Sequence, residues 1–350
     1  MSIESYLRAV PKAELHVHLE GAILPATLLA LAAKNGVDLP ATTEDEVRRW
    51  FVYRDFRHFI EIYVTITKCL RDVEDYERIT YDFGAEMARQ NVKYAEVTFS
   101  PSTHKWLGIS EDVYFTGLTR GRERARADFG VEIAWVFDLV RVSAERDAKA
   151  DYTVGIAIDG MQDGVVALGL GGMEEGFPPE PFAPWFARAQ SAGLHSAPHA
   201  GEIAGPASVW GAIRTLGAER IGHGVRSSED PELVAYLAEH GITLEVCPTS
   251  NIRLGVYPSL EEHPLRRLRD AGVSVTINSD DPPLFNTTLT DEVLLLHTAF
   301  SYDIDAIDTI LLNSVRASFL PSDRQAVLEQ TFVTEMRDLK ANGERPTPSS

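Results

Sequence analysis

Short apolar and β-branched runs recur along the chain, and longer stretches with helical periodicity separate them. Runs of this length predict buried strands. From the second run onward they follow one another at about 25–40 residues, which fits a strand followed by a crossover helix. We therefore predict eight strands, at residues 13–21, 92–100, 132–140, 164–172, 195–201, 220–224, 243–250 and 273–281.

The stretches between these runs predict helices. Residues 72–91 repeat apolar side chains at helical spacing, and residues 230–241 end in Gly241, a residue typical of helix C-termini. Eight strand–helix repeats predict an α/β fold, a closed (β/α)₈ TIM barrel, with a helical insertion between the first two strands. An open, doubly wound sheet is the alternative, but no glycine-rich phosphate turn follows the first strand.

The composition supports one large folded unit. Hydrophobic residues make up 44% of the 350 residues, which is enough for an extensive core. We expect a single barrel domain over residues 1–340. The Pro- and Ser-rich residues 341–350 are expected to form a disordered tail.

The net charge of −19 argues against partners that are themselves polyanions. Nucleic acids and anionic membranes attract basic surfaces, so a small neutral or cationic substrate is expected instead. The chain has two cysteines, an N-terminus without a signal-peptide core, and no apolar run near the ~18 residues of a membrane span. These features predict a cytoplasmic protein without a disulfide framework.

The stretch "KAELHVHLEGA", residues 12–22, interrupts an apolar strand with polar residues at alternate positions, namely His16, His18 and Glu20. Alternate residues of an extended strand project to one face, so these three side chains should converge. Two neighbouring imidazoles pack poorly in a core, but they suit a divalent metal ion.

Other polar residues gather at the predicted C-terminal strand ends, where barrel enzymes carry their chemistry. His199 lies in "HAGE" and Asp280 in "NSDD". With His16 and His18 they supply three imidazoles and one carboxylate, a donor set for zinc, iron(II) or manganese. We expect one ion, because the fourth strand ends in "GLGG" without the lysine that bridges two metals in many barrel hydrolases.

Three further residues at strand ends form a candidate acid–base set. His223 could hold or deprotonate an attacking water, Glu202 could donate a proton if burial raises its pKa, and Asp281 could accept a hydrogen bond from substrate. The alternatives are a structural histidine between two glycines, a surface carboxylate, and an Asp–Asp turn before two prolines. The remaining histidines are expected to be structural or exposed, with His104 near the barrel mouth.

Five motifs, "AELHVHLEGA", "HAGE", "RIGHG", "CPTSN" and "NSDDP", stand in the order and at roughly the spacing of the adenosine deaminase family of metal-dependent hydrolases. The chain resembles this family from about Pro11 to about Leu320. The resemblance implies a (β/α)₈ barrel that holds one zinc ion. The implied ligands are His16, His18, His199 and Asp280.

The resemblance also implies a reaction, the hydrolytic conversion of a 6-aminopurine into a 6-oxopurine and ammonia. Glu202 would protonate purine N1, and His223 would orient and help to deprotonate the attacking water. The implied contacts to the purine and its cover are Asp281 at N7, the backbone N–H of Gly172 at N3, and Phe59 and Tyr63 on an apolar lid helix.

One position departs from the nucleoside-type pattern "HLDG", because this chain has Glu20 where that pattern has aspartate. In the family the aspartate lies near the ribose 5′-hydroxyl, and relatives with glutamate include adenine deaminases and aminodeoxyfutalosine deaminases. The substrate is therefore expected to be adenosine or a 5′-modified relative, with free adenine as the alternative. The pocket rim, expected at residues 100–109 with Lys105 and Trp106, should decide substrate size.

Two other readings of the sequence stay open. One is a different hydrolase on the same scaffold, such as an amidase, a lactonase or a phosphotriesterase. The other is a binding or structural protein that kept the barrel. That protein would be expected to have lost a metal ligand or the acid, and all seven positions are filled.

Overall fold

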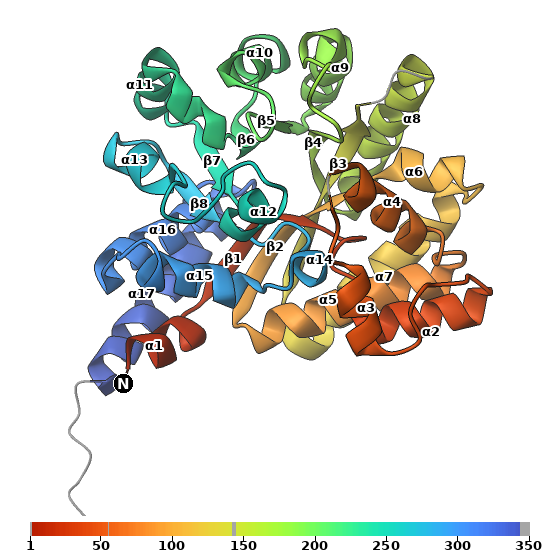
Figure 1. Cartoon of the computed structure of the whole chain (residues 1–350), viewed down its shortest axis with the longest axis horizontal. Helices are drawn as coiled ribbons and strands as arrows, with labels where there is room; N and C mark the ends of the chain where they lie inside the picture. The colour runs from red at the N-terminus through yellow and green to blue at the C-terminus, as the bar shows by residue number, and fades with distance from the viewer. Residues whose placement is uncertain (1, 55, 142–144, 344–350) are drawn as a thin grey trace, which may run out of the picture.

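In the computed structural model, which describes residues 2–54, 56–141 and 145–343, parallel strands pair in chain order to form a ring (Figure 1). The ring closes where Asp280, just past the last strand, pairs with the first strand. The His18 N–H donates to the Asp280 carbonyl at 2.9 Å, and the Asp280 N–H donates to the His16 carbonyl at 3.0 Å. The predicted (β/α)₈ barrel is confirmed. The strands are β1 Lys12–His18, β2 Val92–Phe99, β3 Glu132–Val140, β4 Val165–Gly171, β5 His195–Ala200, β6 Arg220–His223, β7 Thr243–Val246 and β8 Val275–Ile277.

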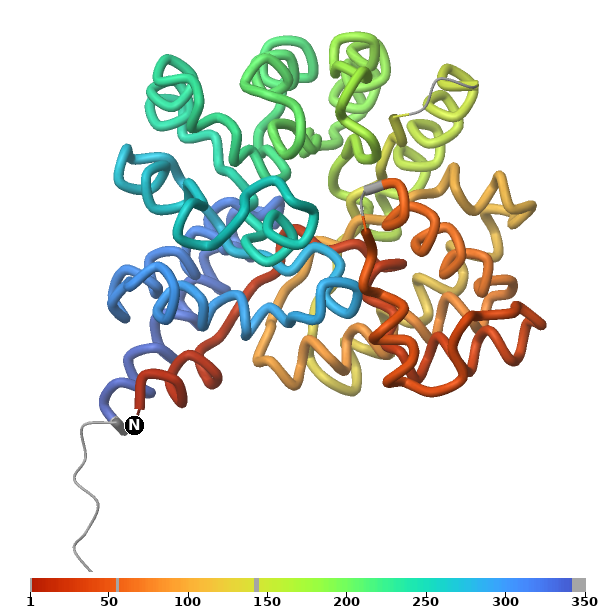
Figure 2. The backbone as a smooth tube through the Cα atoms, in the orientation of Figure 1, coloured from red at the N-terminus to blue at the C-terminus, as the bar shows by residue number. Residues whose placement is uncertain are grey.

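Helices surround the strands as an outer layer, and the tube view follows the chain as it alternates between the two layers (Figure 2). The predicted helical insertion is confirmed, since α2, α3 and α4 precede the crossover helix α5 between β1 and β2. The helices are α1 Ile3–Ala9, α2 Pro25–Asn35, α3 Glu44–Trp50, α4 Phe56–Thr67, α5 Val73–Arg89, α6 Pro101–Trp106, α7 Glu111–Phe129, α8 Arg146–Asp159, η1 Gly160–Asp163, η2 Glu180–Phe182, α9 Ala183–Ala192, α10 Pro206–Leu216, η3 Val225–Glu229, α11 Pro231–His240, α12 Pro248–Arg253, α13 Leu265–Asp270, α14 Pro282–Phe285, α15 Leu289–Thr298, α16 Ile304–Arg316 and α17 Ser322–Gly343. Residues 344–350 of the expected tail lie outside the described residues.

Three predicted strands extend three or more residues past the observed strand ends. The first ends at His18, and the seventh ends at Val246 because Pro248 begins α12. Proline lacks the N–H that a strand needs and is favoured in the first turn of a helix. The eighth strand spans only Val275–Ile277. Asp280 beyond it has a φ of 64°, in the left-handed region, which ends extended pairing there.

Local capping explains where the two predicted helices begin and end. Asp72 accepts the Asp75 N–H at 3.1 Å, and the Asp75 side chain accepts the Asp72 N–H, so a reciprocal capping box starts α5. Asp230 caps α11, and Gly241 ends it with a φ of 65°. Both helices are confirmed within a few residues of the predicted bounds.

Two glycines let α7 pack directly against α5. A Cβ atom on Gly117 would overlap the side chain of Tyr76, and one on Gly121 would overlap Thr80. The two helix backbones therefore approach closely only because α7 lacks side chains at these points. This packing also fixes Tyr76, whose hydroxyl contacts His104 beneath the barrel mouth.

The barrel interior contains a buried ion network below the mouth. The Arg220 guanidinium on β6 contacts Glu245 on the neighbouring strand β7 and Glu96 on β2, across the ring, at 2.5 Å each. It also donates to the Ala317 carbonyl at 2.7 Å and lies over the Phe319 ring. One cation thus compensates two buried carboxylates and ties opposite sides of the barrel together.

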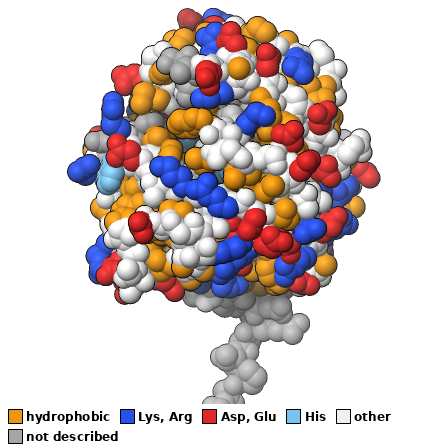
Figure 3. All heavy atoms as spheres, turned by 90° about the vertical axis from the view of Figure 1, so that its right-hand side faces the viewer, with side chains coloured by type: hydrophobic (Ala, Val, Ile, Leu, Met, Phe, Trp, Pro, Cys, Tyr) orange, Lys and Arg blue, Asp and Glu red, His pale blue; other side chains and the backbone are white. Residues whose placement is uncertain are grey.

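The surface in Figure 3 shows acidic and basic side chains interspersed over the face that it presents. Both cysteines, Cys69 and Cys247, are buried and free. Within the described part of the chain, none of the helices combines the length and the apolar character that a membrane span needs.

Replacing Arg220 by methionine should destabilise the protein strongly, since Glu96 and Glu245 would become buried charges without a partner. We expect a loss of about 3–5 kcal/mol in the free energy of unfolding, measured by urea denaturation. The matched control is Arg316→Met, which breaks the exposed pair with Glu329 and should cost less than about 1 kcal/mol. Equal effects of the two substitutions would contradict this account.

Candidate active site

Four residues that the sequence predicted as metal ligands meet at the C-terminal mouth of the barrel. His16 and His18 come from β1, His199 from β5, and Asp280 from the turn after β8. The Nε2 atoms of His18 and His199 lie 3.2 Å apart. Asp280 Oδ1 lies 3.4 Å from His18 Nε2 and 3.6 Å from His16 Nε2. Four side chains that are distant in sequence thus surround one point.

The donor atoms of this cluster fit a divalent cation. His16 Nδ1 donates to Glu245 Oε2 at 2.9 Å, so its Nε2 atom presents a lone pair. That Nε2 atom is buried and has no hydrogen-bond partner among the described residues. Ligand atoms of His16, His18 and His199 lie within 4.8 Å of one another, as do those of His16, His223 and Asp280. Buried imidazole lone pairs beside a carboxylate match the ligand preferences of zinc and its neighbours.

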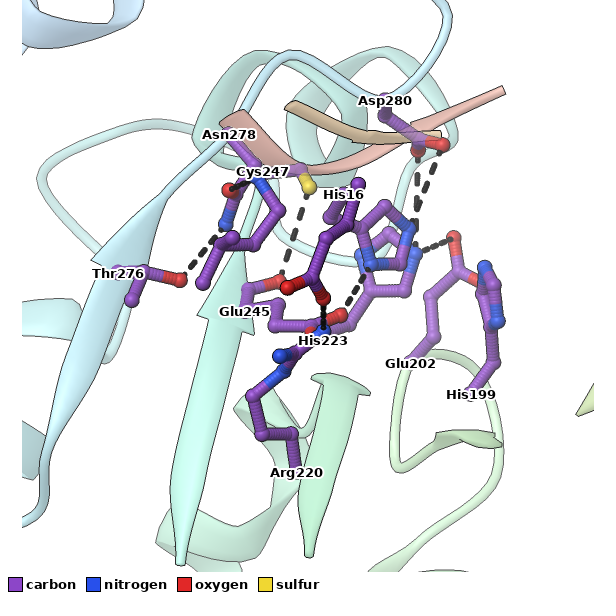
Figure 4. A network of polar contacts seen from close by, with 12 residues as sticks. His16, His199, Glu202, Arg220, His223, Glu245, Cys247, Thr276, Asn278 and Asp280 are labelled. Atoms are coloured by element: carbon purple, nitrogen blue, oxygen red, sulfur yellow. Dashed lines mark hydrogen bonds and ion pairs between the residues drawn. The ribbon is translucent and has the colours of Figure 1, made fainter. Parts of the chain in front are cut away.

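A second set of side chains orients these donors (Figure 4). One oxygen of Glu245 accepts the hydrogen bond from His16, and the other accepts one from Arg220. Ser250 donates to Asp280 Oδ2 at 2.6 Å. Our sequence reasoning did not single out Glu245, although it is the one charged residue in the buried run "TLEV".

A hydrogen-bond relay fixes the tautomer of His223. The Leu265 N–H donates to His263 Nδ1 at 3.2 Å, so His263 carries its proton on Nε2 and donates to Asn251 Oδ1 at 3.0 Å. The Asn251 amide nitrogen then donates to His223 Nδ1 at 3.3 Å. A neutral His223 therefore carries its proton on Nε2, which lies 3.6 Å from Glu202 Oε1 and 3.8 Å from Asp280 Oδ2.

Burial favours the uncharged form of His18, His199 and His223 by lowering the pKa of each. It lowers the pKa of His223 to about 3, and it lowers the pKa of His199 well below the usual value, with the neighbouring imidazoles adding to the effect. Neutral imidazole is the form that binds metals. His223 also has a φ of 59°, so it and Asp280 both hold left-handed backbone conformations.

Glu202 is buried at the mouth and favours its protonated form. Burial, and after it the nearby carboxylates of Asp280 and Glu174, raise the pKa of Glu202 to about 8. At neutral pH the group is therefore an acid with a proton to donate. Its position beside His223 brings together two residues of the predicted acid–base set.

The loop that carries Glu202 is held by a single buried carboxylate. Glu174 accepts four successive backbone N–H groups from residues 201–204, at distances between 2.5 and 3.1 Å. Arg141 supports the same segment by donating to the His199 carbonyl at 2.7 Å. Neither residue was predicted, because their contacts join segments that are separate in the sequence.

Asp281, the third predicted acid–base residue, is buried against the backbone of Gly21. A Cβ atom on Gly21 would overlap its carboxyl group, so glycine is needed after Glu20. Asp281 Oδ1 has no hydrogen-bond partner among the described residues. Burial and the charge of Asp280 raise the pKa of Asp281 well above its usual value.

These groups open into a cavity at the barrel mouth. Phe59 and Tyr63 of α4 cover it, and the Phe59 ring stacks on Phe285 with centroids 5.6 Å apart. Gly172, just past β4, also lines the cavity and has a φ of 87°. The cavity is lined by His18, Phe59, Ile60, Tyr63, Val64, Ser100, Thr103, Asp138, Val140, Gly171, Gly172, His199, Glu202, His223, Leu254, Asp280 and Asp281.

Glu20 does not join the metal-type cluster, because β1 ends at His18 and the strand alternation stops there. It lies fully buried behind the cavity wall. His104 Nε2 contacts Glu20 Oε1 at 2.9 Å, and the Ser100 N–H donates to the same oxygen at 3.2 Å. His104 in turn contacts the Tyr76 hydroxyl at 2.8 Å. His104 is thus a buried structural partner of Glu20.

The expected rim at residues 100–109 is only partly at the cavity. Ser100 and Thr103 line it. Lys105 and Trp106 are exposed, and the Lys105 amine lies 4.1 Å from the centre of the Tyr152 ring instead of facing the mouth. Residues 101–106 form the helical turn of α6 and do not continue the strand. This turn directs Lys105 and Trp106 to a different side from Ser100 and Thr103.

Metal-type donors and a buried acid at this end of a barrel define the class of metal-dependent barrel hydrolases. A family model described as "Adenosine deaminase" matches residues 11–334. The chain therefore belongs to the adenosine deaminase family, and it is a hydrolase that acts on C–N bonds.

Named relatives agree with this assignment. The chain is 42% identical to an aminodeoxyfutalosine deaminase of Streptomyces avermitilis over 93% of this chain and 90% of that protein. It is 38% identical to an adenine deaminase of Albidiferax ferrireducens over 93% of this chain and 96% of that protein. A crystal structure of an amidohydrolase from Burkholderia ambifaria with bound Zn superposes with a TM-score of 0.89, at 26% identity, over 98% of this chain and 95% of that one.

Replacing Glu245 by glutamine should weaken metal binding, because the carboxylate that orients His16 would lose its charge. We expect the affinity for Zn²⁺, measured by competition with a chelator, to fall about 10- to 100-fold. The matched control is Glu219→Gln, which changes a Glu–His pair on the surface with His195. An unchanged affinity in Glu245→Gln would contradict the orienting role.

Proposed function

We propose that this protein catalyses the zinc-dependent hydrolytic deamination of a 6-aminopurine nucleoside to the 6-oxopurine and ammonia. The substrate would be adenosine or a 5′-modified relative such as 6-aminodeoxyfutalosine. The observation that carries the proposal is the buried Glu202, whose raised pKa favours the protonated form, beside a metal-type cluster in the cavity at the barrel mouth. Similarity to the Streptomyces avermitilis aminodeoxyfutalosine deaminase supports the 5′-modified substrate.

The residues proposed to hold one zinc ion are His16, His18, His199 and Asp280. When bound, zinc supplies Lewis acidity that lowers the pKa of water toward about 7. The absence of a lysine after β4, where the chain reads "GLGG", supports one ion over two.

The chain's own groups then manage the protons. Glu202 donates a proton to purine N1, which makes C6 electron-poor. When the oxygen attacks C6, the electron pair of the C6–N1 π bond moves onto N1. His223 donates its Nε2 proton to hold the attacking water, since the Asn251 relay leaves no lone pair on that atom. The Glu202 carboxylate left by the proton transfer to N1 takes up one proton of the water, which restores the acid, and the other proton of the water ends on the departing ammonia.

The purine is oriented by groups around the same cavity. Asp281, kept protonated by burial, donates to N7. The Gly172 N–H donates to N3, and Phe59 and Tyr63 cover the base and exclude water from it. Glu20, held by His104, lies behind the wall on the side proposed to face the sugar.

Deamination of free adenine is the second candidate. It is favoured by the 38% identity to the Albidiferax ferrireducens adenine deaminase over nearly the whole of both chains. The two candidates differ only in what purine N9 carries.

A substrate panel tests the proposed reaction. Purified protein with one equivalent of Zn²⁺ is mixed with adenosine, 6-aminodeoxyfutalosine, 5′-methylthioadenosine or adenine, and ammonia release is measured. We expect at least one nucleoside to be turned over with a higher kcat/KM than adenine. No ammonia from any 6-aminopurine would reject the function, and a preference for adenine would select the second candidate.

Replacing Glu202 by glutamine should abolish the proton transfer while the metal-type cluster stays intact. We expect kcat to fall about 10²- to 10⁴-fold with an unchanged zinc content by elemental analysis. The control is Glu175→Gln, an exposed glutamate nearby, which should leave kcat unchanged. Full activity in Glu202→Gln would show that another group supplies the proton.

A further inference from the structure

Asp138 is a buried carboxyl group in the cavity that the proposed reaction does not use. It lies on β3 and is 2% exposed. Its side chain points inward with those of Val136 and Val140, whereas Phe137 and Leu139 point outward to the helices. The strand "WVFDLV" thus places one polar residue on its cavity face, the same period-2 pattern that the histidines of β1 show.

The neighbouring strand is shaped to leave room for this carboxyl group. A Cβ atom on Gly169 would overlap Asp138 Oδ1, and one on Gly171 would overlap Oδ2. Both glycines lie on β4, in register with Asp138 and Val140 of β3. Any side chain at either position would displace the carboxyl group from its place at the cavity wall.

One oxygen of this carboxyl group is left unpaired in the part of the chain that the structure describes. Asp138 Oδ1 is buried and has no hydrogen-bond partner among the described residues. A buried polar atom without a partner destabilises the folded protein. Asp138 lines the cavity, and its second oxygen, Oδ2, lies beside Gly171, which also lines it, so a ligand can hydrogen-bond the carboxyl group from that side.

The position of Asp138 in the ring indicates which end of a bound purine it would contact. The residues proposed to act at C6 come from β5, β6 and the turn after β8. Asp138 lies on β3, in the other half of the ring. In a purine, N9 lies at the end remote from C6. A base whose C6 lies beside the residues of β5, β6 and the turn after β8 therefore directs its N9 substituent toward the half of the ring that contains Asp138.

We propose that the Asp138 carboxyl group hydrogen-bonds a sugar hydroxyl on purine N9 and thereby selects a nucleoside over the free base. This inference rests on the proposed function. Burial raises the pKa of Asp138 to about 8, and the charge of Glu20 also raises it. The neutral acid both donates and accepts, which suits a hydroxyl partner.

A sugar fits this half of the cavity better than an unsubstituted base. Ser100, Thr103 and Tyr63, which carry hydroxyl groups, line the same cavity as Asp138. The N9 side of free adenine carries a single N–H donor, whereas a ribose offers several hydroxyls that both donate and accept. A sugar can therefore satisfy Asp138 and these neighbours together.

The test compares substrates that differ by one hydroxyl group. Adenosine, 2′-deoxyadenosine, 3′-deoxyadenosine and adenine are assayed with the zinc-loaded wild-type protein and with Asp138→Leu. A compound that is not turned over is assayed as a competitive inhibitor of the preferred reaction. In the wild type, we expect removal of one of the two hydroxyls to lower kcat/KM, or to raise Ki, at least tenfold.

In Asp138→Leu we expect this preference to shrink to less than about threefold, while values for adenine and for the disfavoured deoxynucleoside change little. Asp138→Asn, which still accepts and donates, should retain most of the preference. The control is Val140→Ala, which alters the same wall without a polar change and should affect all compounds alike. Zinc content and thermal melting confirm that each variant is folded.

Two results would overturn the role of Asp138. The first is a wild-type protein that discriminates less than threefold against both deoxynucleosides, a result that needs no variant. The second is an Asp138→Leu protein that keeps the wild-type preference or loses activity equally on all compounds. Both are distinct from failure of the proposed function, in which the wild type releases ammonia from no 6-aminopurine.

Discussion

The Glu245 carboxylate links the charges inside the barrel to the chemistry at its mouth. One oxygen accepts the proton of His16 Nδ1, and the other is paired with Arg220. Arg220 keeps this buried carboxylate ionised, and the ionised carboxylate fixes which nitrogen of His16 faces the cluster. A metal-type donor therefore depends on a cation that lies deeper in the barrel and is held by Glu96 on the far side of the ring.

The mouth divides into two halves with different chemistry. Strands β5 and β6 and the turn after β8 contribute the residues suited to proton transfer, and these are supported by Glu174 and by the Asn251 relay. The segment after β2 contributes Ser100 and Thr103, and β3 contributes Asp138, whose Oδ1 atom has no hydrogen-bond partner among the described residues. Helix α4 lies over both halves and contributes aromatic rings. The groups suited to proton transfer and the proposed sugar contact of Asp138 thus come from different strands of one scaffold.

Sequence pattern predicted the fold and the residues of the metal-type cluster because both follow from simple periodicities. Strand–helix repeats indicated the barrel, and strand alternation placed His16 and His18 together. The same rule failed for Glu20, which follows the end of the strand. It would have found Glu245 and Asp138, each a lone charge within an apolar run, had carboxylates in strands been weighed like histidines.

Other features lay beyond any local pattern. The pairing of Arg220 with Glu96 joins residues 124 positions apart, and nothing near either residue indicates the other. The relay through His263 and Asn251 depends on the fold of the segment after β7. Such contacts are set by which strands the ring brings face to face.

The left-handed backbone at His223 and Asp280 has a consequence for how this protein can evolve. Each non-glycine residue in that conformation costs about 1–3 kcal/mol, and glycine would relieve the cost. Selection for thermal robustness alone would thus favour loss of the very imidazole and carboxylate that line the mouth. Retention of both side chains therefore requires continued selection for catalytic activity. A descendant protein without that selection should lose these two side chains early and gain thermal stability as a result.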